Sequence, residues 1–318
     1  MDSPLVSVIC LCYNHEKFIK EALYSVVNQT YKNIELIIVD DASSDESRKA
    51  IREFKNKFSS TIYLPIEKNV GNCKAFNLGF ALSKGSFVID FATDDVMMTD
   101  RIAKQVSIFE TLSPKFGVVF TDADYIDDRG KFLKQHYKYL FRKKLLTNVP
   151  TGDVYAEILS TYFVASPTMM IRRSVLEQLN GYDENLAYED FDFWVRSSRI
   201  FKYAFLNESL TKIRRSKNSM SSGWYKHGDT QLYSTYLVCR KIQKLNKNTE
   251  ENSSLVKRVR YEIRQSVFSK NVKEAGLFFQ LLTELTKPTL TDRILIGIRH
   301  LPLPFRWFRQ LYHTIRFS

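Results

Sequence analysis

One stretch near the N-terminus decides the fold class: residues 5–41 read LVSVICLCYNHEKFIKEALYSVVNQTYKNIELIIVDD. It opens with an apolar run, Leu5 to Leu11, that is long enough for a buried strand. Residues 16–29 then carry apolar side chains at helical spacing, and Ile34 to Val39 forms a second apolar run. This order of strand, helix and strand predicts a parallel β-α-β unit with a right-handed crossover.

The alternation of apolar runs and helical patterns continues through about the first third of the chain. We therefore predict an α/β protein with a mostly parallel central sheet flanked by helices. Residues 125–150 break the pattern and are rich in Lys, Arg and aromatic side chains, which predicts a surface excursion or a mobile loop. The other expected elements are strands at 61–64, 86–91, 117–120 and 167–171, helices at 45–57, 72–83, 100–112 and 189–199, and edge strands at 203–206 and 210–214.

Polarity and charge divide the chain into three parts. The segment 246–254 is polar and is the best linker candidate, so we expect a domain at 1–245 and a helical, basic C-terminal extension at 255–318. The net charge of the chain is +12, and the extension holds twelve Lys and Arg against four Asp and Glu, which places +8 there. A basic extension favours an anionic partner, either a membrane surface or nucleic acid.

Composition favours a cytoplasmic protein. No apolar run is long enough to cross a bilayer, so we expect no transmembrane helix. The N-terminus lacks a basic region and a small-residue cleavage site, so we expect no secretory signal. The four cysteines include Cys10 and Cys12 on one face of the first strand, where they are expected to be reduced thiols that pack as small apolar groups.

Polar side chains follow three of the predicted strands at the point where each strand ends. Tyr13 follows the first strand, Asp41 ends the second, and Asp94 and Asp95 follow the fourth. Ligands of open α/β sheets bind at the carboxyl ends of the strands, where these side chains would meet. A single Asp pair in such a place often only caps a turn or a helix. The agreement of three strand ends favours a binding site.

These residue types suit a nucleotide diphosphate and a metal ion. The Tyr13 ring can stack on a base, and the Asp41 carboxylate can accept a hydrogen bond from the imide N–H of uracil or thymine. Asp94 and Asp95 suit one divalent cation that is bound through carboxylates and phosphate oxygens. The chain has no glycine-rich phosphate loop, so the metal would neutralise the diphosphate.

Motifs between residue 5 and about residue 215 carry a resemblance to a known family. They are Val6–Asn14, Ser25–Tyr31 followed by Val39–Asp45, Asn69–Gly71 with Asn77–Gly79, Ala92–Asp95, and Asn180–Glu184 with Glu189, Asp190 and Trp194. In order and spacing, the sequence resembles the family 2 glycosyltransferases, which have the GT-A fold. The Q-x-x-R-W signature of processive synthases is absent after Trp194, which favours transfer of one sugar at a time.

The resemblance implies a role for each matching residue. It assigns Tyr13 and Asp41 to the base, Asn69 and Gly71 to the donor site, Asp94 to the ribose, Asp95 to Mn²⁺ or Mg²⁺, and Asp190 to the general base. Glu189 is adjacent and is the alternative base. The chain departs from many relatives at Leu11-Cys12 and at Ala92, which leaves the identity of the donor open.

The implied activity is metal-dependent, inverting transfer of a single sugar. The donor would be a nucleotide sugar, a UDP-sugar by the base-binding pair, and the acceptor a hydroxyl of a glycan or lipid-linked oligosaccharide. Synthesis of bacterial surface polysaccharide is the setting that analogy suggests. Arg214, Arg215 and Lys217 follow the predicted base helix, where they form either a lid over the diphosphate or a solvated basic loop.

Two other classes of function share features with this sequence. A non-catalytic binder of anionic polymer or nucleic acid would use the positive charge, but that charge lies mostly in the extension, whereas the strand ends are acidic and repel phosphate unless a metal intervenes. We therefore expect no nucleic-acid partner. A metal-dependent nucleotidyltransferase shares the diphosphate chemistry, but Glu189-Asp190 favours a sugar acceptor that needs a base.

The end of the extension has the pattern of an interfacial helix. Phe305, Phe308, Tyr312 and Ile315 recur at helical spacing, with arginines at 306, 309 and 316 among them. Aromatic rings and cations on one short helix suit the surface of an anionic membrane. The alternative is that this helix packs on the protein. We expect a peripheral protein at the inner face of the plasma membrane.

Overall fold

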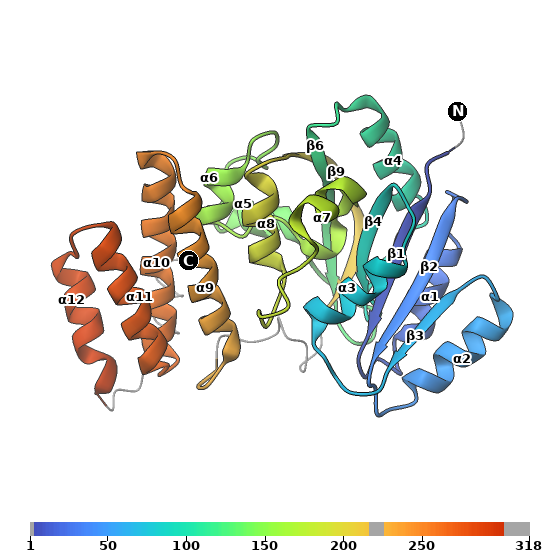
Figure 1. The fold of residues 1–318 in the computed structure, drawn as a ribbon, viewed down its shortest axis with the longest axis horizontal. Coiled ribbons are helices and arrows are strands. Elements are labelled where there is room, and N and C mark those ends of the chain that lie inside the picture. Colours follow the sequence, from blue (N-terminus) through green and yellow to red (C-terminus); the bar gives the residue numbers. More distant parts are fainter. Residues whose placement is uncertain (1–2, 216–225, 302–318) are drawn as a thin grey trace.

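The computed structural model describes residues 3–215 and 226–301 of the chain. Helices cover both faces of a central sheet, and a stack of C-terminal helices extends beyond one side of it (Figure 1). The predicted α/β class is confirmed, because the N-terminal strands are parallel and alternate with helices.

The first half of the chain forms the parallel part of the sheet. Its elements are β1 (Val6–Cys12), α1 (Ile19–Val27), β2 (Ile34–Asp41), α2 (Ser47–Lys57), β3 (Ile62–Ile66), α3 (Asn72–Leu82), β4 (Phe87–Ala92) and α4 (Arg101–Thr111). All positions of β1 are buried, which explains its uninterrupted apolar run. Side chains alternate along it: Val8 and Cys10 join the core cluster that includes residues of α1, α2 and α4, whereas Ile9 and Leu11 join the cluster that includes residues of α3.

The second half adds both parallel and antiparallel strands to this sheet. Its elements are β5 (Val96–Met97), β6 (Phe116–Ile126), β7 (Phe132–Gln135), α5 (His136–Arg142), α6 (Tyr155–Ser160), η1 (Ser166–Thr168), β8 (Met170–Arg172), α7 (Arg173–Leu179), α8 (Asp190–Ser198) and β9 (Lys202–Arg214). β8 is antiparallel to β4 and β6, whereas β6 is parallel to β9. The order is β3-β2-β1-β4-β8-β6-β9-β5, and β7 pairs with β6.

Two parts of the second half differ from the prediction. The two expected edge strands form one continuous strand, β9, which lies between β6 and β5. The strand is continuous because register shifts on either side of Asp122 in β6 accommodate the polar residues in the middle of β9. Residues 125–150 are also more ordered than expected. They begin as the end of β6 and continue as β7 and α5, because Tyr125, Tyr137 and Leu140 are buried.

The C-terminal part is a stack of helices: α9 (Thr230–Leu245), α10 (Thr249–Phe268), α11 (Val272–Leu285), α12 (Leu290–Gly297) and η2 (Ile298–His300). The structure differs from the predicted linker at 246–254, because only residues 246–248 separate α9 from α10 and the rest of that segment is helical. The Asn248 side chain caps α10 by accepting from the Glu251 amide at 2.9 Å. The polarity of this segment reflects a capped first helical turn with acidic residues, which the helix dipole favours.

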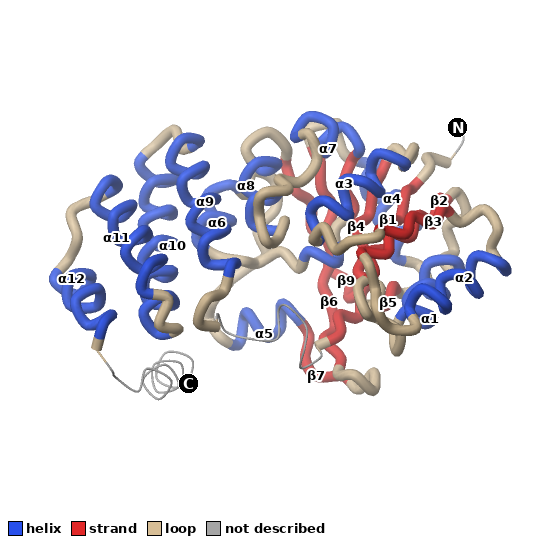
Figure 2. The backbone as a smooth tube through the Cα atoms, turned by 60° about the horizontal axis from the view of Figure 1, so that its bottom comes forward, coloured by secondary structure: helices blue, strands red, loops and turns tan. Residues whose placement is uncertain are grey.

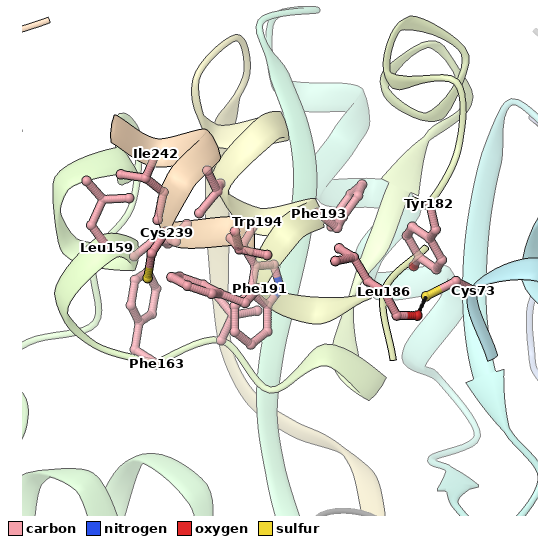
Figure 3. Packing of buried hydrophobic residues seen from close by; sticks show 14 of the residues in the cluster. Cys73, Leu159, Phe163, Tyr182, Leu186, Phe191, Phe193, Trp194, Cys239 and Ile242 are labelled. Carbon is pink, nitrogen blue, oxygen red and sulfur yellow. Dashed lines mark hydrogen bonds between the residues drawn. The ribbon is translucent and has the colours of Figure 1, made fainter. Parts of the chain in front are cut away.

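The C-terminal helices share their hydrophobic core with the sheet domain. One cluster of buried side chains runs from Ile9 and Ile37 in the sheet to Leu255 in α10 and Phe278 in α11. In Figure 3, Cys239 and Ile242 of α9 lie near Leu159 and Phe163, in the same cluster as the aromatic residues of α8. The helices from α9 onward therefore complete the core instead of following a flexible connection.

Arg258 of α10 links this helix to the sheet domain at the base of α8. Its side chain is buried, pairs with Glu262 at 3.3 Å and donates to the Leu159 carbonyl at 3.1 Å. Its guanidinium lies 3.9 Å from the ring centroid of Tyr162 and 5.2 Å from that of Phe191. Removal of this buried cation should destabilise the fold, because the Glu262 carboxylate would stay buried without this partner.

Arg258→Ala should lower the free energy of unfolding by about 3–5 kcal/mol, the usual result of breaking a buried ion pair from one side. Denaturant unfolding of the full chain measures this. The matched control is Arg293→Ala on the exposed surface of α12, which should change stability by less than about 0.5 kcal/mol. Equal effects of the two substitutions would show that α10 is not an integral part of the core.

Candidate functional site

The three predicted strand ends meet at one edge of the sheet. β1 lies between β2 and β4 in parallel register, with Cys12 opposite Asp40 and Leu11 opposite Ala92. Tyr13 follows β1 and is 50% exposed, so its ring is accessible at this edge. The following loops are tied together, since the Asn14 amide oxygen accepts from the Ser44 backbone at 2.8 Å and His15 Nδ1 lies 2.9 Å from Thr93 Oγ1.

Asp41 is buried and holds the loop before α3. Its two carboxylate oxygens accept from the backbone N–H groups of Val70 at 2.7 Å and Gly71 at 3.0 Å, and Asn69 donates to the Asp41 carbonyl at 3.1 Å. Gly71 has a φ of 86°, which favours glycine at this turn. A carboxylate can accept about four hydrogen bonds, so Asp41 keeps capacity for a base N–H. The structure thus brings Asp41, Asn69 and Gly71 together.

Asp40, the neighbour of Asp41, has a different role. It is fully buried and forms an ion pair of 2.6 Å with Arg48 of α2. Arg48 also donates to the Ile66 carbonyl at the end of β3. Asp40 therefore fastens α2 to the sheet edge, and only the second carboxylate of the pair faces the loop at 69–71.

Asp94 and Asp95 form an acidic pair after β4. Asp95 is 3% exposed, and its Oδ1 accepts from the Arg214 backbone N–H at 2.8 Å. Burial, followed by the negative charge of Asp94, raises the pKa of Asp95 well above its usual range. A cation bound here would relieve both effects.

The acidic pair suits a divalent cation whose ligands come partly from the protein and partly from a bound diphosphate. Within residues 3–215 and 226–301, no three His, Cys, Asp or Glu side chains come together as a metal-binding set. Mg²⁺ and similar ions are commonly held by one or two carboxylates plus substrate phosphates. Asp94 and Asp95 fit this pattern, with the remaining ligands supplied by a diphosphate and water.

The arginines at the end of β9 and directly after it make different contacts. Arg214 is buried and donates to the carbonyls of Asp94 at 2.9 Å and Asp127 at 3.0 Å, and it pairs with Glu21 at 2.7 Å. It therefore braces the acidic loop and is not a lid residue. Arg215 lies 4.6 Å from the Tyr125 ring centroid, and its charge lowers the pKa of both Asp95 and Asp190. Lys217 lies outside the described residues.

A second group of carboxylates lies next to the first. Asp90 of β4 accepts from the Tyr182 hydroxyl at 3.2 Å, and Glu189 accepts from the Asn72 side chain. Burial and the charge of Asp190 raise the pKa of Asp90 to about 7. Burial, Asp190 and Asp90 also raise the pKa of Glu189 well above its usual range. Three acidic groups therefore share a poorly solvated space at the start of α8.

Asp190 and Glu189 differ in their contacts. Burial raises the pKa of Asp190, although hydrogen bonds and the charge of Arg215 oppose this. Asp190 Oδ1 is buried and accepts no hydrogen bond from the part of the chain that the structure describes. Glu189, in contrast, is engaged by Asn72 of α3. The free acceptor oxygen on Asp190 makes it the better candidate for taking a proton from a bound hydroxyl group.

The loop before α8 is anchored on both sides. From α3, the Asn77 side chain bonds to the backbone N–H and carbonyl of Tyr182, each at 2.9 Å, and Cys73 lies 3.6 Å from the Leu186 carbonyl (Figure 3). From α9, Lys241 pairs with Asp183 and Asp192 at 2.6 Å. These contacts fix the start of α8, where Asp190 lies.

Asp90 is the site residue that the sequence analysis did not single out. Its signal is an acidic residue between Ile89 and Phe91 in an otherwise apolar strand. Because Val88 belongs to the core cluster on the α3 side, the period of two places Asp90 on that face as well. Asn72 and Lys241 were also not singled out, since their partners are distant in the sequence.

Comparison with known proteins identifies the family. Residues 7–179 match the profile described as Glycosyl transferase family 2, which is more than half of the chain. An uncharacterised glycosyltransferase of Methanocaldococcus jannaschii is 30% identical over 220 residues, covering 67% of this chain and 72% of that protein. One from Rickettsia prowazekii is 30% identical over 213 residues, covering 67% of this chain and 64% of that protein. The chain therefore belongs to glycosyl transferase family 2.

Solved structures show the same fold. TarS of S. aureus, residues 1–349 with UDP-GlcNAc, has a TM-score of 0.68 at 19% identity and covers 96% of this chain and 87% of that one. The mannosyltransferase PcManGT from Pyrobaculum calidifontis, with GDP-Man and Mn²⁺, has a TM-score of 0.60 at 16% identity and covers 98% and 85%. The protein is thus a glycosyltransferase with the GT-A fold, as the sequence motifs predicted.

The raised pKa of Asp90 predicts a pH-dependent stability. Its pKa is about 7 in the folded protein and about 4 in an unfolded chain. The folded state therefore keeps a proton that the unfolded state has lost, so stability falls as pH rises through 7. Between pH values of about 5 and 8, the thermal midpoint of the wild type should fall more than that of Asp90→Asn. Exposed Asp128→Asn, the matched control, should retain the wild-type dependence.

Proposed function

We propose that the protein transfers one sugar from a nucleotide sugar to an acceptor hydroxyl group, with inversion at the anomeric carbon. The observation that carries this proposal is the buried Asp190 oxygen, which has no hydrogen-bond partner in the described part of the chain. It lies at the start of α8, close enough to Arg215 for the charge of that residue to lower its pKa. The same arginine also influences Asp95 of the acidic pair.

The reaction is a single displacement. Asp190 accepts the proton of the acceptor hydroxyl while its oxygen forms a bond to the anomeric carbon. The bond from that carbon to the nucleotide diphosphate breaks on the opposite face, and the diphosphate leaves. A positioned general base contributes about 10²–10⁴-fold to such a reaction. Glu189 is held by Asn72, and its hydrogen bond with Asp190 lowers the pKa of Asp190, which favours the ionised carboxylate that a general base needs.

We assign Asp95, with Asp94 beside it, to a divalent cation, Mn²⁺ or Mg²⁺. Such an ion supplies positive charge to the diphosphate when it is bound. Arg215 would meet the same diphosphate from the end of β9. The raised pKa of Asp95 supports this assignment, because an adjacent cation would stabilise the ionised carboxylate in its buried position.

The proposed donor is a UDP-sugar. Tyr13 is accessible for stacking on the base, and Asp41 lies at the end of the adjacent strand with acceptor capacity for an imide N–H. Asp94 would contact the ribose, and the loop of Asn69 and Gly71 would line the same site. Similar folds are known with UDP-GlcNAc and with GDP-Man, so the fold is compatible with either base.

The proposed acceptor is a hydroxyl of a glycan or of a lipid-linked oligosaccharide, in bacterial surface polysaccharide synthesis. The site has acidic groups on its acceptor side, which suits a neutral sugar hydroxyl. No helix in the described part of the chain is long and apolar enough to cross a membrane. Peripheral association through Phe305 to Ile315 stays a prediction, because that segment lies outside the described residues.

Asp190→Asn should retain UDP binding and lower turnover by at least about 10²-fold, because the amide cannot accept the proton. Release of UDP in the presence of a donor sugar measures turnover, and calorimetry measures binding. Glu189→Gln is the matched control and should be the milder change. If Glu189→Gln abolishes turnover and Asp190→Asn does not, then Glu189 is the base.

Asp95→Ala should remove the effect of Mn²⁺ on UDP binding. Calorimetric titration of UDP with and without Mn²⁺ should show tighter binding with the ion for the wild type and no difference for the variant. Asp100→Ala is the control, since Asp100 pairs with Lys104 on the surface of α4. Wild-type UDP affinity and turnover that are unchanged by excess EDTA would contradict the metal assignment.

A further inference from the structure

Residues 127–145 form a surface that the proposed chemistry does not use. We call them the basic arm: the turn after β6, strand β7, and helix α5 with the three residues that follow it. Figure 2 shows β7 and α5 at the lower margin of the molecule. From Lys131 to Leu145 the sequence has six Lys and Arg and no Asp or Glu. The arm is therefore strongly cationic.

The arm also exposes large apolar side chains. Phe132 is 57% exposed and Leu133 51%, and both lie at the start of β7. Phe141 of α5 and Leu145 after it are 41% and 39% exposed. Soluble proteins rarely expose several large apolar side chains together unless a partner covers them.

Exposed cations are interleaved with these apolar side chains. Lys131 precedes Phe132, while Lys138 and Arg142 flank Phe141 on α5 and Lys144 precedes Leu145. Lys138, Phe141, Arg142 and Leu145 have the spacing of one helical face. The Lys144 φ of 52° and the bond from the Leu145 N–H to the Leu140 carbonyl, at 3.0 Å, end the helix and fix Leu145 beside it.

The inner face of the arm is fixed to the sheet domain. His136 is buried between the Phe163 carbonyl, at 2.8 Å, and the Tyr125 hydroxyl, at 3.0 Å. Burial lowers the pKa of His136 to about 4, so the ring is neutral and holds the arm at physiological pH. The Tyr137 N–H donates to the Asp122 carboxylate at 3.2 Å. The arm thus has a buried, anchored side and an outer side that combines cations with apolar groups.

Like charges lie close together in the arm. Lys134 lies 3.5 Å from the Tyr139 ring centroid and 5.0 Å from that of Tyr125. Burial, then the charges of Arg215 and Arg142, lower the pKa of Lys134, which shows that the nearby charges are repulsive. An anionic surface placed against the arm would relieve this repulsion.

We propose that the outer face of the basic arm binds the surface of an anionic lipid bilayer. Cations alone would also suit a polyanionic chain, but the exposed Phe132, Leu133, Phe141 and Leu145 favour a bilayer, in which apolar groups enter the boundary beneath the head groups. This contact is separate from the segment at 305–315.

The arm is placed to bring a bilayer near the reaction. Tyr125 of β6 bonds to His136 of the arm and lies against Arg215, which influences Asp95 and Asp190. A lipid-linked acceptor could thus reach Asp190 from the bound bilayer. This benefit rests on the proposed function, whereas binding of the arm to the bilayer does not.

The test is flotation of the full chain with vesicles of phosphatidylcholine, with and without phosphatidylglycerol, at low salt. Lys138→Ala with Arg142→Ala should weaken binding to the anionic vesicles by about 30-fold, because each cation near the surface contributes about 1 kcal/mol and about 1.4 kcal/mol corresponds to a tenfold change in affinity. The matched control is Lys55→Ala with Lys57→Ala on the exposed side of α2, which removes the same charge and should bind as the wild type.

A second variant tests the apolar part. Phe132→Ser with Phe141→Ser should reduce the binding that persists at high salt, where charge is screened. The proposal is overturned if the wild type does not bind anionic vesicles, or if the arm variants bind as the wild type or no worse than the α2 control. It is also overturned if the arm variants lose turnover only on a soluble polyanionic acceptor.

Hydrolysis of the nucleotide sugar without acceptor separates the two proposals. It should be unchanged in the arm variants, and its absence in the wild type would reject the proposed function but not the bilayer contact.

Discussion

Burial of several carboxylates at one edge of the sheet is the constraint on which the site depends. The charge of Asp190 raises the pKa of Asp90 and of Glu189, and the charge of Asp94 raises that of Asp95. Groups of like charge stay this close only when the surrounding structure fixes them. The donors that do so are Tyr182, Asn72 and the Arg214 backbone, and each comes from a different element.

The C-terminal helices stabilise the same site from behind. Lys241 of α9 pairs with Asp192, two residues after Asp190, and Arg258 of α10 packs against the ring of Phe191. α8 is therefore held by α3 on one side and by α9 and α10 on the other. The folded unit that carries Asp190 extends through these helices, because the contacts that fix the start of α8 come from them as well as from the sheet.

Local patterns were sufficient to predict the first half of the molecule. The apolar runs at β1, β2 and β4 and the helical spacing of α1 identified the parallel unit, and the acidic residues after the strands lie together at the edge where we propose that the donor binds. Family motifs placed Asp190 at the start of a helix, where the structure has it. These features depend on residues that are close in sequence, or on the general geometry of parallel sheets.

Features that depend on distant partners were not predictable in this way. The role of Asp90 requires Tyr182, and the bracing role of Arg214 requires Glu21 and the carbonyls of Asp94 and Asp127. The polar residues of β9 suggested a break between two strands, whereas they form a bulge in a continuous strand whose partner residues lie on the distant β6. The polar start of α10 suggested a linker, although Asn248 caps a helix there.

The stereochemistry of the first product tests the account most directly. Proton NMR can follow hydrolysis of an α-linked UDP-sugar by the full chain and identify the anomer that is released before mutarotation. A single displacement assisted by Asp190 predicts that the β anomer forms first. If the α anomer forms first, the reaction does not proceed by direct attack with Asp190 as the base.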